Sequence, residues 1–209
     1  MSGTRVYHRV DPVVYTIDNF ASPSMCEHMI EKGVQTLKPA RVSSAQGALC
    51  HKARTNSSTW IQKHTDERIS NLAKRIAEEI KVPLEYAENF QFVHYKQGEE
   101  FEQHFDAFDC KIRAQKKSQR IWTCLLYLND VEHDFGGSTY FPELDLRVIP
   151  KQGRLLVFRN TVAPHNSIHP LSLHAGEPLK KGEKYACNLW FRDQVQVPTL
   201  NLKSVRDVR

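Results

Sequence analysis

Two His-x-Asp triplets are the residues of this sequence best suited to metal chemistry. They are His64-Thr65-Asp66 and His104-Phe105-Asp106. On a β-strand, residues i and i+2 project from the same face about 6.5–7 Å apart, so one triplet can supply two ligands to one metal ion. Two histidines and one carboxylate on a single face hold Fe(II) and leave three coordination positions open for a cosubstrate and oxygen. The third ligand must then come from a segment that is distant in the sequence.

The surroundings of the two triplets differ. The first triplet opens a helical pattern, where Thr65 or Asp66 can cap the helix N-terminus, and this role explains both residues without a metal. The second triplet ends a β-type stretch that follows the turn Lys96-Gln97-Gly98. Because a strand end is the better place for paired ligands, we predict that the second triplet binds a metal and that the first does not.

Three histidines further along the chain are candidates for the third ligand: His165, His169 and His174. The first two lie in the Pro-flanked loop 163–170, where exposed polar residues are the default. His174 ends a short apolar run and precedes a turn and a final strand that begins at Lys184, which predicts two antiparallel strands. Such a turn can set Lys184 beside the metal, where a buried ammonium requires an anion such as the distal carboxylate of 2-oxoglutarate. A surface lysine is the alternative interpretation.

Two amphipathic helices are expected in the first part of the chain. The first covers about Pro23–Leu37 behind a Ser22 cap, and the second covers about Asp66–Ile80 and is stopped by Val82-Pro83. After residue 89 the pattern changes to short β-type runs separated by turn residues. The expected strands are Phe90–Tyr95, Ile121–Leu128, Ser138–Phe141, Leu146–Ile149, Arg154–Arg159, Ser172–His174 and Tyr185–Arg192.

This order of elements predicts an α+β fold. Its core is expected to be a double-stranded β-helix, or jelly roll, with the N-terminal helices buttressing one sheet. The run Ile121–Leu128 is almost continuously apolar, which is typical of a strand covered on both faces. We expect a single domain over residues 1–209, divided into helical support over about 15–82, the core over about 85–193 and a C-terminal extension over 194–209.

The composition is that of an ordinary globular protein: of 209 residues, 40% are hydrophobic and 25% are charged. The formal net charge of +5 suits an anionic small molecule or an acidic partner as well as a plain solvated surface. The sequence contains no dense Lys/Arg block, signal sequence or membrane-spanning run, and its five scattered cysteines indicate reduced thiols. We therefore expect a cytoplasmic protein with no nucleic-acid or membrane partner.

Four longer motifs make the sequence similar to one known family. They are HYKQGEEFEQHFD, QRIWTCLLYLND, GGSTYFP and LHAGEPLKKGEKYACNLWFR, in this order and with compatible spacing. Over roughly residues 15–193 the chain resembles the prolyl 4-hydroxylases among the 2-oxoglutarate-dependent dioxygenases. Within that family it most resembles the small stand-alone catalytic domains of algae, bacteria and large viruses. The resemblance implies an enzyme of the procollagen-proline 4-dioxygenase type.

The resemblance also implies roles for individual residues. The residues that match the family's iron ligands are His104, Asp106 and His174. Those that match the residues binding the distal carboxylate of 2-oxoglutarate are Lys184, Tyr95 and Thr139. Those that match the substrate side are Arg120 and Trp190, together with Arg54, Thr55 and Trp60 from the region that folds over the peptide.

By the same resemblance, the expected reaction couples oxidative decarboxylation of 2-oxoglutarate to succinate and CO₂ with hydroxylation of peptidyl proline at C4. Fe(II), 2-oxoglutarate and O₂ are the expected cofactor and cosubstrates, with ascorbate as the reductant. The expected partner is a proline-containing peptide or protein. The enzyme is expected to be a monomer or a homodimer in the cytoplasm, which for a viral protein means the cytoplasm of the host.

Two departures from the family bear on the substrate. Phe101 stands where some peptide-hydroxylating relatives carry a tyrosine, and the loop Asn160–Leu171 is shorter than in algal relatives. Alternatives are therefore a hydroxylase of free proline, of another amino acid or of peptidyl lysine, and, more remotely, a non-catalytic jelly-roll binding module. The polar segments Arg41–Ser58 and Asp109–Gln119, which are expected to be mobile lids, favour an extended polypeptide substrate.

Overall fold

The computed structural model describes residues 3–44, 47–49 and 52–196, and over these residues the fold is mostly sheet with few helices. The α-helices are α1 (Pro23–Val34), α2 (Glu67–Ile80) and α3 (Cys110–Lys116). The strands are β1 (Arg5–Val10), β2 (Val13–Ile17), β3 (Lys38–Pro39), β4 (Val42–Ser44), β5 (Gly47–Leu49), β6 (Ser57–Ile61), β7 (Phe90–Tyr95), β8 (Phe101–His104), β9 (Arg120–Tyr127), β10 (Thr139–Phe141), β11 (Leu146–Val148), β12 (Leu155–Arg159), β13 (Thr161–Val162), β14 (Ser167–Ile168), β15 (His174–Gly176) and β16 (Lys184–Arg192).

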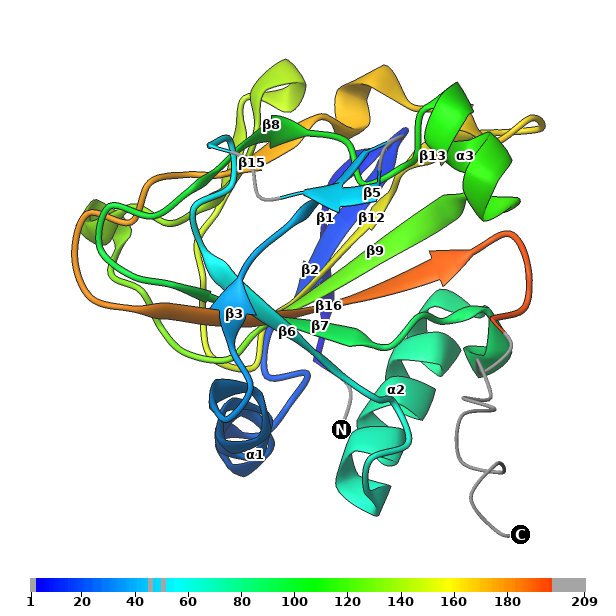
Figure 1. Cartoon of the computed structure of the whole chain (residues 1–209). Helices are drawn as coiled ribbons and strands as arrows, with labels where there is room; N and C mark the ends of the chain where they lie inside the picture. The colour runs from blue at the N-terminus through cyan, green and yellow to red at the C-terminus, as the bar shows by residue number, and fades with distance from the viewer. Residues whose placement is uncertain (1–2, 45–46, 50–51, 197–209) are drawn as a thin grey trace, which may run out of the picture.

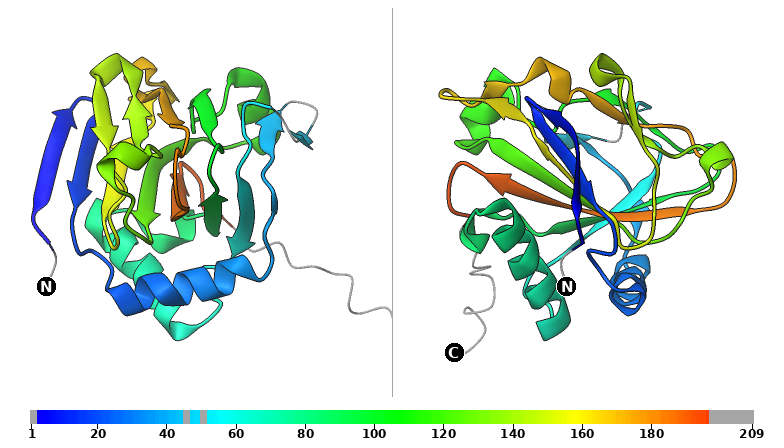
Figure 2. Two further views of the ribbon diagram at one scale, coloured as in Figure 1. Left: turned by 90° about the vertical axis from the view of Figure 1, so that its left-hand side faces the viewer. Right: turned by 180° about the vertical axis from the view of Figure 1, so that it is seen from behind.

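Two antiparallel sheets build the fold. The large sheet has the strand order β1-β2-β12-β9-β16-β7-β6-β3, and the small sheet has the order β11-β10-β15-β8. Figures 1 and 2 show β8 and β15 on one side of the large sheet and the helices α1 and α2 on its other side. The large sheet is therefore a middle layer between the helices and the small sheet.

Strand β9 lies near the centre of the large sheet, between β12 and β16. Successive side chains of a strand point to opposite faces, and in β9 both faces are covered. Cys124 and Leu126 belong to the apolar cluster on the helix side, whereas Leu125 and Tyr127 belong to the cluster between the sheets. This double burial explains the continuous apolar run in the sequence and confirms the interpretation that it is a strand covered on both faces.

The two predicted long helices form, and side-chain caps start both of them. The side chain of Ser22 accepts a hydrogen bond from the backbone N–H of Met25, and α1 ends at Val34, three residues before the expected end. Asp66 caps α2 by accepting from the N–H of Ile69 at 2.9 Å. This cap explains the first His-x-Asp triplet without a metal, as the sequence predicts.

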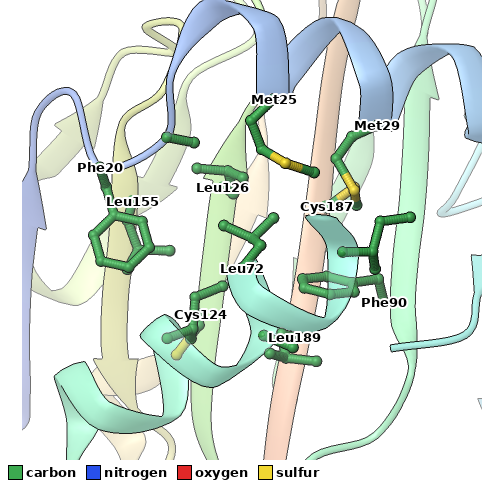
Figure 3. Packing of buried hydrophobic residues seen from close by; sticks show 14 of the residues in the cluster. Phe20, Met25, Met29, Leu72, Phe90, Cys124, Leu126, Leu155, Cys187 and Leu189 are labelled. Atoms are coloured by element: carbon green, nitrogen blue, oxygen red, sulfur yellow. The ribbon is translucent and has the colours of Figure 1, made fainter. Parts of the chain in front are cut away.

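The helices pack on the large sheet through a shared apolar cluster. Figure 3 shows Met25 and Met29 of α1 and Leu72 of α2 pointing toward side chains of the sheet strands. At Gly33 the helix α1 comes so close to the sheet that an added Cβ would lie 2.3 Å from the ring of Phe92. A larger residue there would push α1 away from the sheet.

Replacing Asp66 by alanine is expected to destabilise the fold by about 1 kcal/mol, because it removes the oxygen that caps α2. It also removes the carboxylate that lies 2.8 Å from Nε2 of His28. Urea unfolding followed by circular dichroism measures the loss. Asp66→Asn keeps a capping oxygen and should recover most of the stability. An Asp66→Ala variant as stable as the wild type would contradict the capping role.

Two expectations about local structure are wrong. The sequence predicts no strand before Phe90, but β1 and β2 add two strands to the edge of the large sheet. The segment Asp109–Gln119 was expected to be a mobile loop, but most of it forms α3. Asp109 caps this helix by accepting a hydrogen bond from the N–H of Ile112 at 2.8 Å. An Asp N-cap outweighs the polar composition of the segment.

Two further expectations need correction. In its described part, the segment Arg41–Ser58 contains β4, β5 and the start of β6 rather than a loop alone, while residues 45–46 and 50–51 lie outside the described residues. The strand expected over Ser172–His174 begins only at His174, because Pro170–Ser172 forms a short 3₁₀ turn with proline at its first position. The expected C-terminal extension is described only to residue 196. Among the described residues, no helix is both long and apolar enough to cross a membrane.

Candidate active site

The small sheet brings His104 and His174 together. Strands β8 and β15 are antiparallel neighbours in which these two histidines are direct cross-strand partners, and their ring centroids lie 4.3 Å apart. Asp106 follows the end of β8, with its carboxylate oxygens 3.7 Å from Nε2 of His104 and 3.6 Å from Nε2 of His174. One ligand atom from each of the three side chains lies within 4.8 Å of the others, so they can hold a single metal ion.

The second ring nitrogen of each histidine is held by the backbone. Nδ1 of His104 lies 2.8 Å from the carbonyl oxygen of Glu102, and Nδ1 of His174 lies 2.9 Å from that of Ser172. A carbonyl oxygen can only accept, so each Nδ1 donates its proton and each Nε2 is the nitrogen left to bind a metal. Burial and the neighbouring imidazole lower the pKa of His104 to about 3, which keeps this ring neutral at pH 7. Both Nε2 atoms are thus prepared to bind a metal.

Asp106 is buried and held by a chain of hydrogen bonds. Oγ1 of Thr123 donates to Oδ2 of Asp106 at 2.7 Å, and Nδ2 of Asn160 donates to Oγ1 of Thr123 at 2.9 Å. Burial by itself raises the pKa of Asp106, but the imidazoles of His174 and His104 outweigh it and lower the pKa to about 2. The donor set therefore consists of two imidazole nitrogens and one anionic oxygen, which fits Fe(II).

Lys184 is a buried lysine at the start of β16, with 3% of its surface exposed. Its Nζ donates to the carbonyl oxygen of Gly137 at 2.5 Å and lies 4.9 Å from the centre of the Tyr95 ring. No ion pair joins it to a carboxylate within the described part of the chain. Burial lowers the pKa of Lys184 to about 7, with a smaller opposing effect from Glu177. A buried ammonium without a counter-charge fits an anionic ligand.

Lys184 and the candidate metal ligands line one pocket of about 1050 Å³. Tyr95 and Thr139 line it as well. Tyr95 is the direct cross-strand partner of Lys184, so both side chains lie on the same face of the large sheet. Thr139 comes from the small sheet, and its hydroxyl accepts a hydrogen bond from that of Tyr127 at 2.7 Å. The pocket thus places three polar groups from both sheets near the metal site.

The antiparallel pairing predicted between the strands of His174 and Lys184 is wrong. His174 lies on β15 in the small sheet, paired with β8 and β10, whereas Lys184 lies on β16 in the large sheet, paired with β7 and β9. The segment between them crosses from one sheet to the other. The two side chains share the pocket because the sheets face each other.

Arg120 and Trp190 form another part of the pocket wall. The guanidinium carbon of Arg120 lies 3.5 Å from the centre of the Trp190 ring. Glu88 binds Arg120 through two hydrogen bonds of 2.7 and 2.9 Å and also accepts from Nε of Arg192 at 2.7 Å. Nε1 of Trp190 is buried, and a hydrogen-bonding contact of its side chain with Asp106 helps to lower the pKa of that carboxyl. This wall is therefore aromatic, and through Trp190 it reaches the carboxylate of the candidate metal site.

The three residues predicted to lie in the region covering the peptide have different positions. Arg54 is buried and lines the pocket, and Trp60 lines it while 51% exposed, with its ring centroid 6.0 Å from that of Trp190. Thr55 does not line the pocket. Its hydroxyl donates to the carbonyl of Glu100 and accepts from the N–H of the same residue, so it joins two backbone segments. The expectation that Thr55 contacts substrate is not met by this geometry.

The other two histidine candidates lie outside the triad. His169 accepts a hydrogen bond from the N–H of Leu171 through Nδ1, and its Nε2 lies 3.4 Å from Asp11. The backbone carbonyl of His165 accepts from Arg113. Neither residue belongs to the group of side chains that could hold a metal ion in the described part of the chain, so the choice of His174 among the three agrees with the geometry.

Sequence reasoning missed Thr123, Glu88 and Gln91. Thr123 had one usable signal, because it is a hydroxyl residue inside an otherwise apolar strand. Glu88 and Gln91 lie next to and within β7, but nothing in their spacing predicts their partners, which are Arg120 and Arg192 for Glu88 and Arg54 for Gln91. These pairs join residues that are far apart in the chain.

Comparison with known proteins identifies the family. Residues 90–192 match the model of the 2OG-Fe(II) oxygenase superfamily. Prolyl 4-hydroxylase 13 of Arabidopsis thaliana is 32% identical over 203 residues, which cover 88% of this chain and 72% of the plant protein. The chain belongs to the prolyl 4-hydroxylase family. As a member of that family within the 2OG-Fe(II) oxygenases, it is a 2-oxoglutarate-dependent dioxygenase that uses Fe(II), 2-oxoglutarate and O₂.

Viral members of the prolyl 4-hydroxylase family are similar to this chain too. A putative prolyl 4-hydroxylase of Acanthamoeba polyphaga mimivirus is 32% identical over 185 residues, covering 86% of this chain and 74% of the viral protein. The structure of the viral collagen prolyl hydroxylase from Paramecium Bursaria Chlorella virus-1, solved as its 2OG complex, is 29% identical, with a TM-score of 0.71 over 86% of this chain and 95% of that chain. The resemblance inferred from the four sequence motifs is confirmed.

Proposed function

We propose that this protein is a prolyl 4-hydroxylase that acts on peptidyl proline, with Fe(II) held by His104, Asp106 and His174. The observation that carries the proposal is the shared pocket of this triad and Lys184, a buried ammonium without a carboxylate partner among the described residues. A metal-binding module with no cosubstrate would not require that cation. The names of the plant and viral relatives support proline as the substrate.

Lys184 is the proposed anchor for the distal carboxylate of 2-oxoglutarate. A charge-assisted hydrogen bond between its ammonium and a carboxylate would offset the cost of burying both groups. Tyr95 and Thr139 line the pocket beside it and can donate hydroxyl hydrogens to the same carboxylate. The solved 2OG complex of a relative supports a cosubstrate site in this fold.

Bound Fe(II), with 2-oxoglutarate and O₂, supplies the oxidation, which yields succinate, CO₂ and a hydroxyl group at C4 of proline. The protein's own residues hold the proposed iron ligands in position. The backbone carbonyls of Glu102 and Ser172 orient the two imidazoles, and Thr123 orients the carboxylate of Asp106. The buried pocket wall excludes water from the site. Ascorbate is the reductant usual for the family.

The proline-containing peptide is proposed to lie against the aromatic wall of the pocket. Trp190 and Trp60 present flat apolar surfaces on which a proline ring can pack. Arg120 keeps Trp190 in place by stacking on its ring, and Glu88 holds Arg120. These contacts support a substrate with a rigid ring rather than a flexible side chain such as lysine.

A direct test measures succinate release and maps the product. Proline-rich peptides, lysine-containing peptides and free proline would each be incubated with enzyme, 2-oxoglutarate and ascorbate, with Fe(II) present or chelated. We expect iron-dependent succinate release with the proline peptides and a 16 Da mass increase on proline. Hydroxylation of free proline or of lysine alone would overturn the peptidyl-proline proposal, and turnover independent of iron would overturn the dioxygenase site.

The affinity for 2-oxoglutarate is expected to fall as the pH rises above about 7. The pKa of Lys184 in the free enzyme is lowered by burial to about 7, and a bound carboxylate favours its charged form. Above this pH, binding must take up a proton, so the dissociation constant should rise by up to about tenfold per pH unit. Titration calorimetry with Mn(II) in place of Fe(II) measures it from pH 6 to pH 9.

Lys184→Arg is the matched control for this pH dependence, because arginine stays protonated throughout this range. Its affinity for 2-oxoglutarate should change less with pH than that of the wild type, whatever its absolute value. A wild-type affinity that is constant from pH 6 to pH 9 would contradict a lowered pKa at Lys184.

The two facing antiparallel sheets support a double-stranded β-helix core within a single domain over residues 1–209. The burial of α1 and α2 against the large sheet supports their assignment to that domain. A cytoplasmic location and a monomeric or homodimeric state stay predictions from the sequence, as does the absence of nucleic-acid and membrane partners.

A further inference from the structure

Arg54 is a buried cation in the substrate part of the pocket, with 8% of its surface exposed. Its guanidinium carbon lies 4.5 Å from the centre of the Phe101 ring. That ring is stacked on the imidazole of His104, with the centroids 3.5 Å apart. A single aromatic ring therefore separates Arg54 from the proposed iron site.

The hydrogen bonds of Arg54 go to uncharged oxygens. Nε donates to Oδ1 of Asn56 at 3.0 Å, one terminal nitrogen donates to the carbonyl of Arg41 at 3.1 Å, and the other donates to Oε1 of Gln91 at 3.1 Å. A guanidinium has five N–H groups, and described residues accept from three of those on Arg54. The described residues therefore leave one N–H group on each terminal nitrogen for a ligand. These two unused N–H groups are enough to donate two hydrogen bonds to a carboxylate.

No carboxylate forms an ion pair with Arg54 in the described part of the chain, although another guanidinium that lines the pocket has one. Arg120 is bound to Glu88 at 2.7 Å. Burial lowers the pKa of Arg54, but a guanidinium remains charged at neutral pH. A buried charge without a partner is costly, which makes a negatively charged ligand favourable here.

The charges around Arg54 leave it as an unneutralised positive centre. Lys38 and Arg41 line the same pocket and add positive charge at its exposed rim. Three of the described acidic residues line the pocket: Asp106 belongs to the proposed iron site, Asp109 caps α3, and Glu102 is an exposed residue of β8 that forms no ion pair with Arg54. The remaining buried cation, Lys184, already has a proposed ligand in 2-oxoglutarate. The chain's formal net charge of +5 also suits an acidic partner.

We infer that Arg54 is a carboxylate-binding site for the substrate, so that this enzyme prefers a proline with an aspartate or glutamate close to it in the peptide. The inference rests on the proposed function and adds the chemical class of the peptide. An extended peptide advances about 3.3–3.6 Å per residue. An acidic side chain one or two residues from the target proline therefore spans the width of the Phe101 ring that separates Arg54 from His104.

The test compares matched peptides in which one residue differs. Peptides with a single proline would carry aspartate or glutamate one or two positions before or after it, and their partners would carry asparagine or glutamine there, with both peptide ends blocked. The wild type should show a KM at least about tenfold lower for the acidic member at one of these positions, because a two-pronged guanidinium–carboxylate pair is among the strongest polar contacts. Arg54→Gln should remove the difference between the two members.

The ratio of KM values within one variant is the decisive quantity, because a fold defect changes both peptides equally. Peptide binding measured by fluorescence anisotropy, with Mn(II) and 2-oxoglutarate but without O₂, gives a second readout that needs no turnover. Arg54→Lys keeps the charge without the guanidinium and should retain part of the preference. Arg68→Gln is the matched control, since Arg68 lies on α2 and donates to the carbonyl of Ser24.

Several results would overturn the inference. One is equal KM values for acidic and amide peptides with the wild type, while both are hydroxylated, which would leave the proposed function intact. Another is a rise in the 2-oxoglutarate dissociation constant in Arg54→Gln that matches the effect on peptides, which would assign Arg54 to the cosubstrate. A preference confined to free proline, or to peptides that end in an unblocked carboxylate, would show that the α-carboxylate is the ligand instead of an acidic side chain. Absence of any hydroxylation would instead refute the proposed function.

Discussion

The Asp106→Ala variant is expected to lose its iron and, with it, succinate release. Asp106 supplies the anionic oxygen of the proposed donor set, and its two carboxylate oxygens lie 3.7 and 3.6 Å from the histidine Nε2 atoms. Loss of a residue that only hydrogen-bonds to a metal ligand typically reduces metal affinity or activity by about 10- to 100-fold. Loss of the ligand itself should therefore reduce both by more than about 100-fold. The cavity left by the carboxylate would be lined by Thr123 and the two imidazoles, none of which carries a negative charge.

Iron content after anaerobic reconstitution and succinate release are the two measurements. The sequence offers a matched control, because Asp66→Ala makes the same change in the other His-x-Asp triplet. That variant should lose about 1 kcal/mol of stability through its cap and keep iron and turnover. Wild-type iron content and turnover in Asp106→Ala would refute the iron site, as would an equal loss of iron in both variants.

The Lys184→Ala variant is expected to raise the KM for 2-oxoglutarate by about 30-fold or more. Truncating one partner of a buried, hydrogen-bonded charge pair costs about 2–5 kcal/mol, which corresponds to that change in affinity. The effect is large because the pocket holds the cosubstrate carboxylate away from water, and no other amine lines the buried end of the described pocket. At saturating 2-oxoglutarate, kcat should fall much less, since Lys184 is not among the proposed iron ligands.

Steady-state kinetics at varied 2-oxoglutarate, with the peptide saturating, separate KM from kcat. Lys63→Ala is the matched control, because Lys63 is the other buried lysine of the described residues and donates to the backbone carbonyl of Ala87, outside the pocket. It should cost stability without changing the KM for 2-oxoglutarate. An unchanged KM in Lys184→Ala would remove Lys184 from its assigned role.

The local features of this protein could be predicted from short stretches of its sequence. Ser22 and Asp66 cap the two long helices, as their residue types predict, and β7 spans the expected range Phe90–Tyr95. The run that became β9 is buried on both faces, as its continuous apolar character predicts. Such features depend on contacts between residues a few positions apart, or on the average environment of a segment, and both leave a pattern in the sequence.

The edges of the fold are harder to predict from the sequence, because their structure depends on contacts with distant segments. β1 and β2 gain their structure by pairing along the large sheet, and β1 is exposed along its whole length, so its composition carries little pattern. The 3₁₀ turn at Pro170–Ser172 delays the start of β15 to His174. In these places, the partner strand or a single proline decides the structure rather than the period of apolar residues.

The metal ligands show most clearly which features are local in the sequence and which depend on the tertiary structure. The triplet His104-Phe105-Asp106 and its position at a strand end identify two ligands from residue types and spacing alone. The pairing of His104 with His174 depends on the register of β8 against β15, which joins segments about seventy residues apart. The position of Lys184 depends on the facing of two sheets, since its strand is not a neighbour of the His174 strand.

Ligand types, helix caps and the buried central strand therefore follow from the sequence, because each depends on chemistry that is local in the chain. Three features follow only from the tertiary structure: the assembly of the three candidate iron ligands, the absence of a carboxylate partner for Lys184 among the described residues, and the uncharged hydrogen-bond partners of Arg54. Whether a buried charge has a partner depends on every segment that folds around it, and spacing along the chain carries no record of those neighbours. The proposed cosubstrate anchor and the inferred carboxylate site both rest on such charges, so the structure was needed to find the second and to place the first.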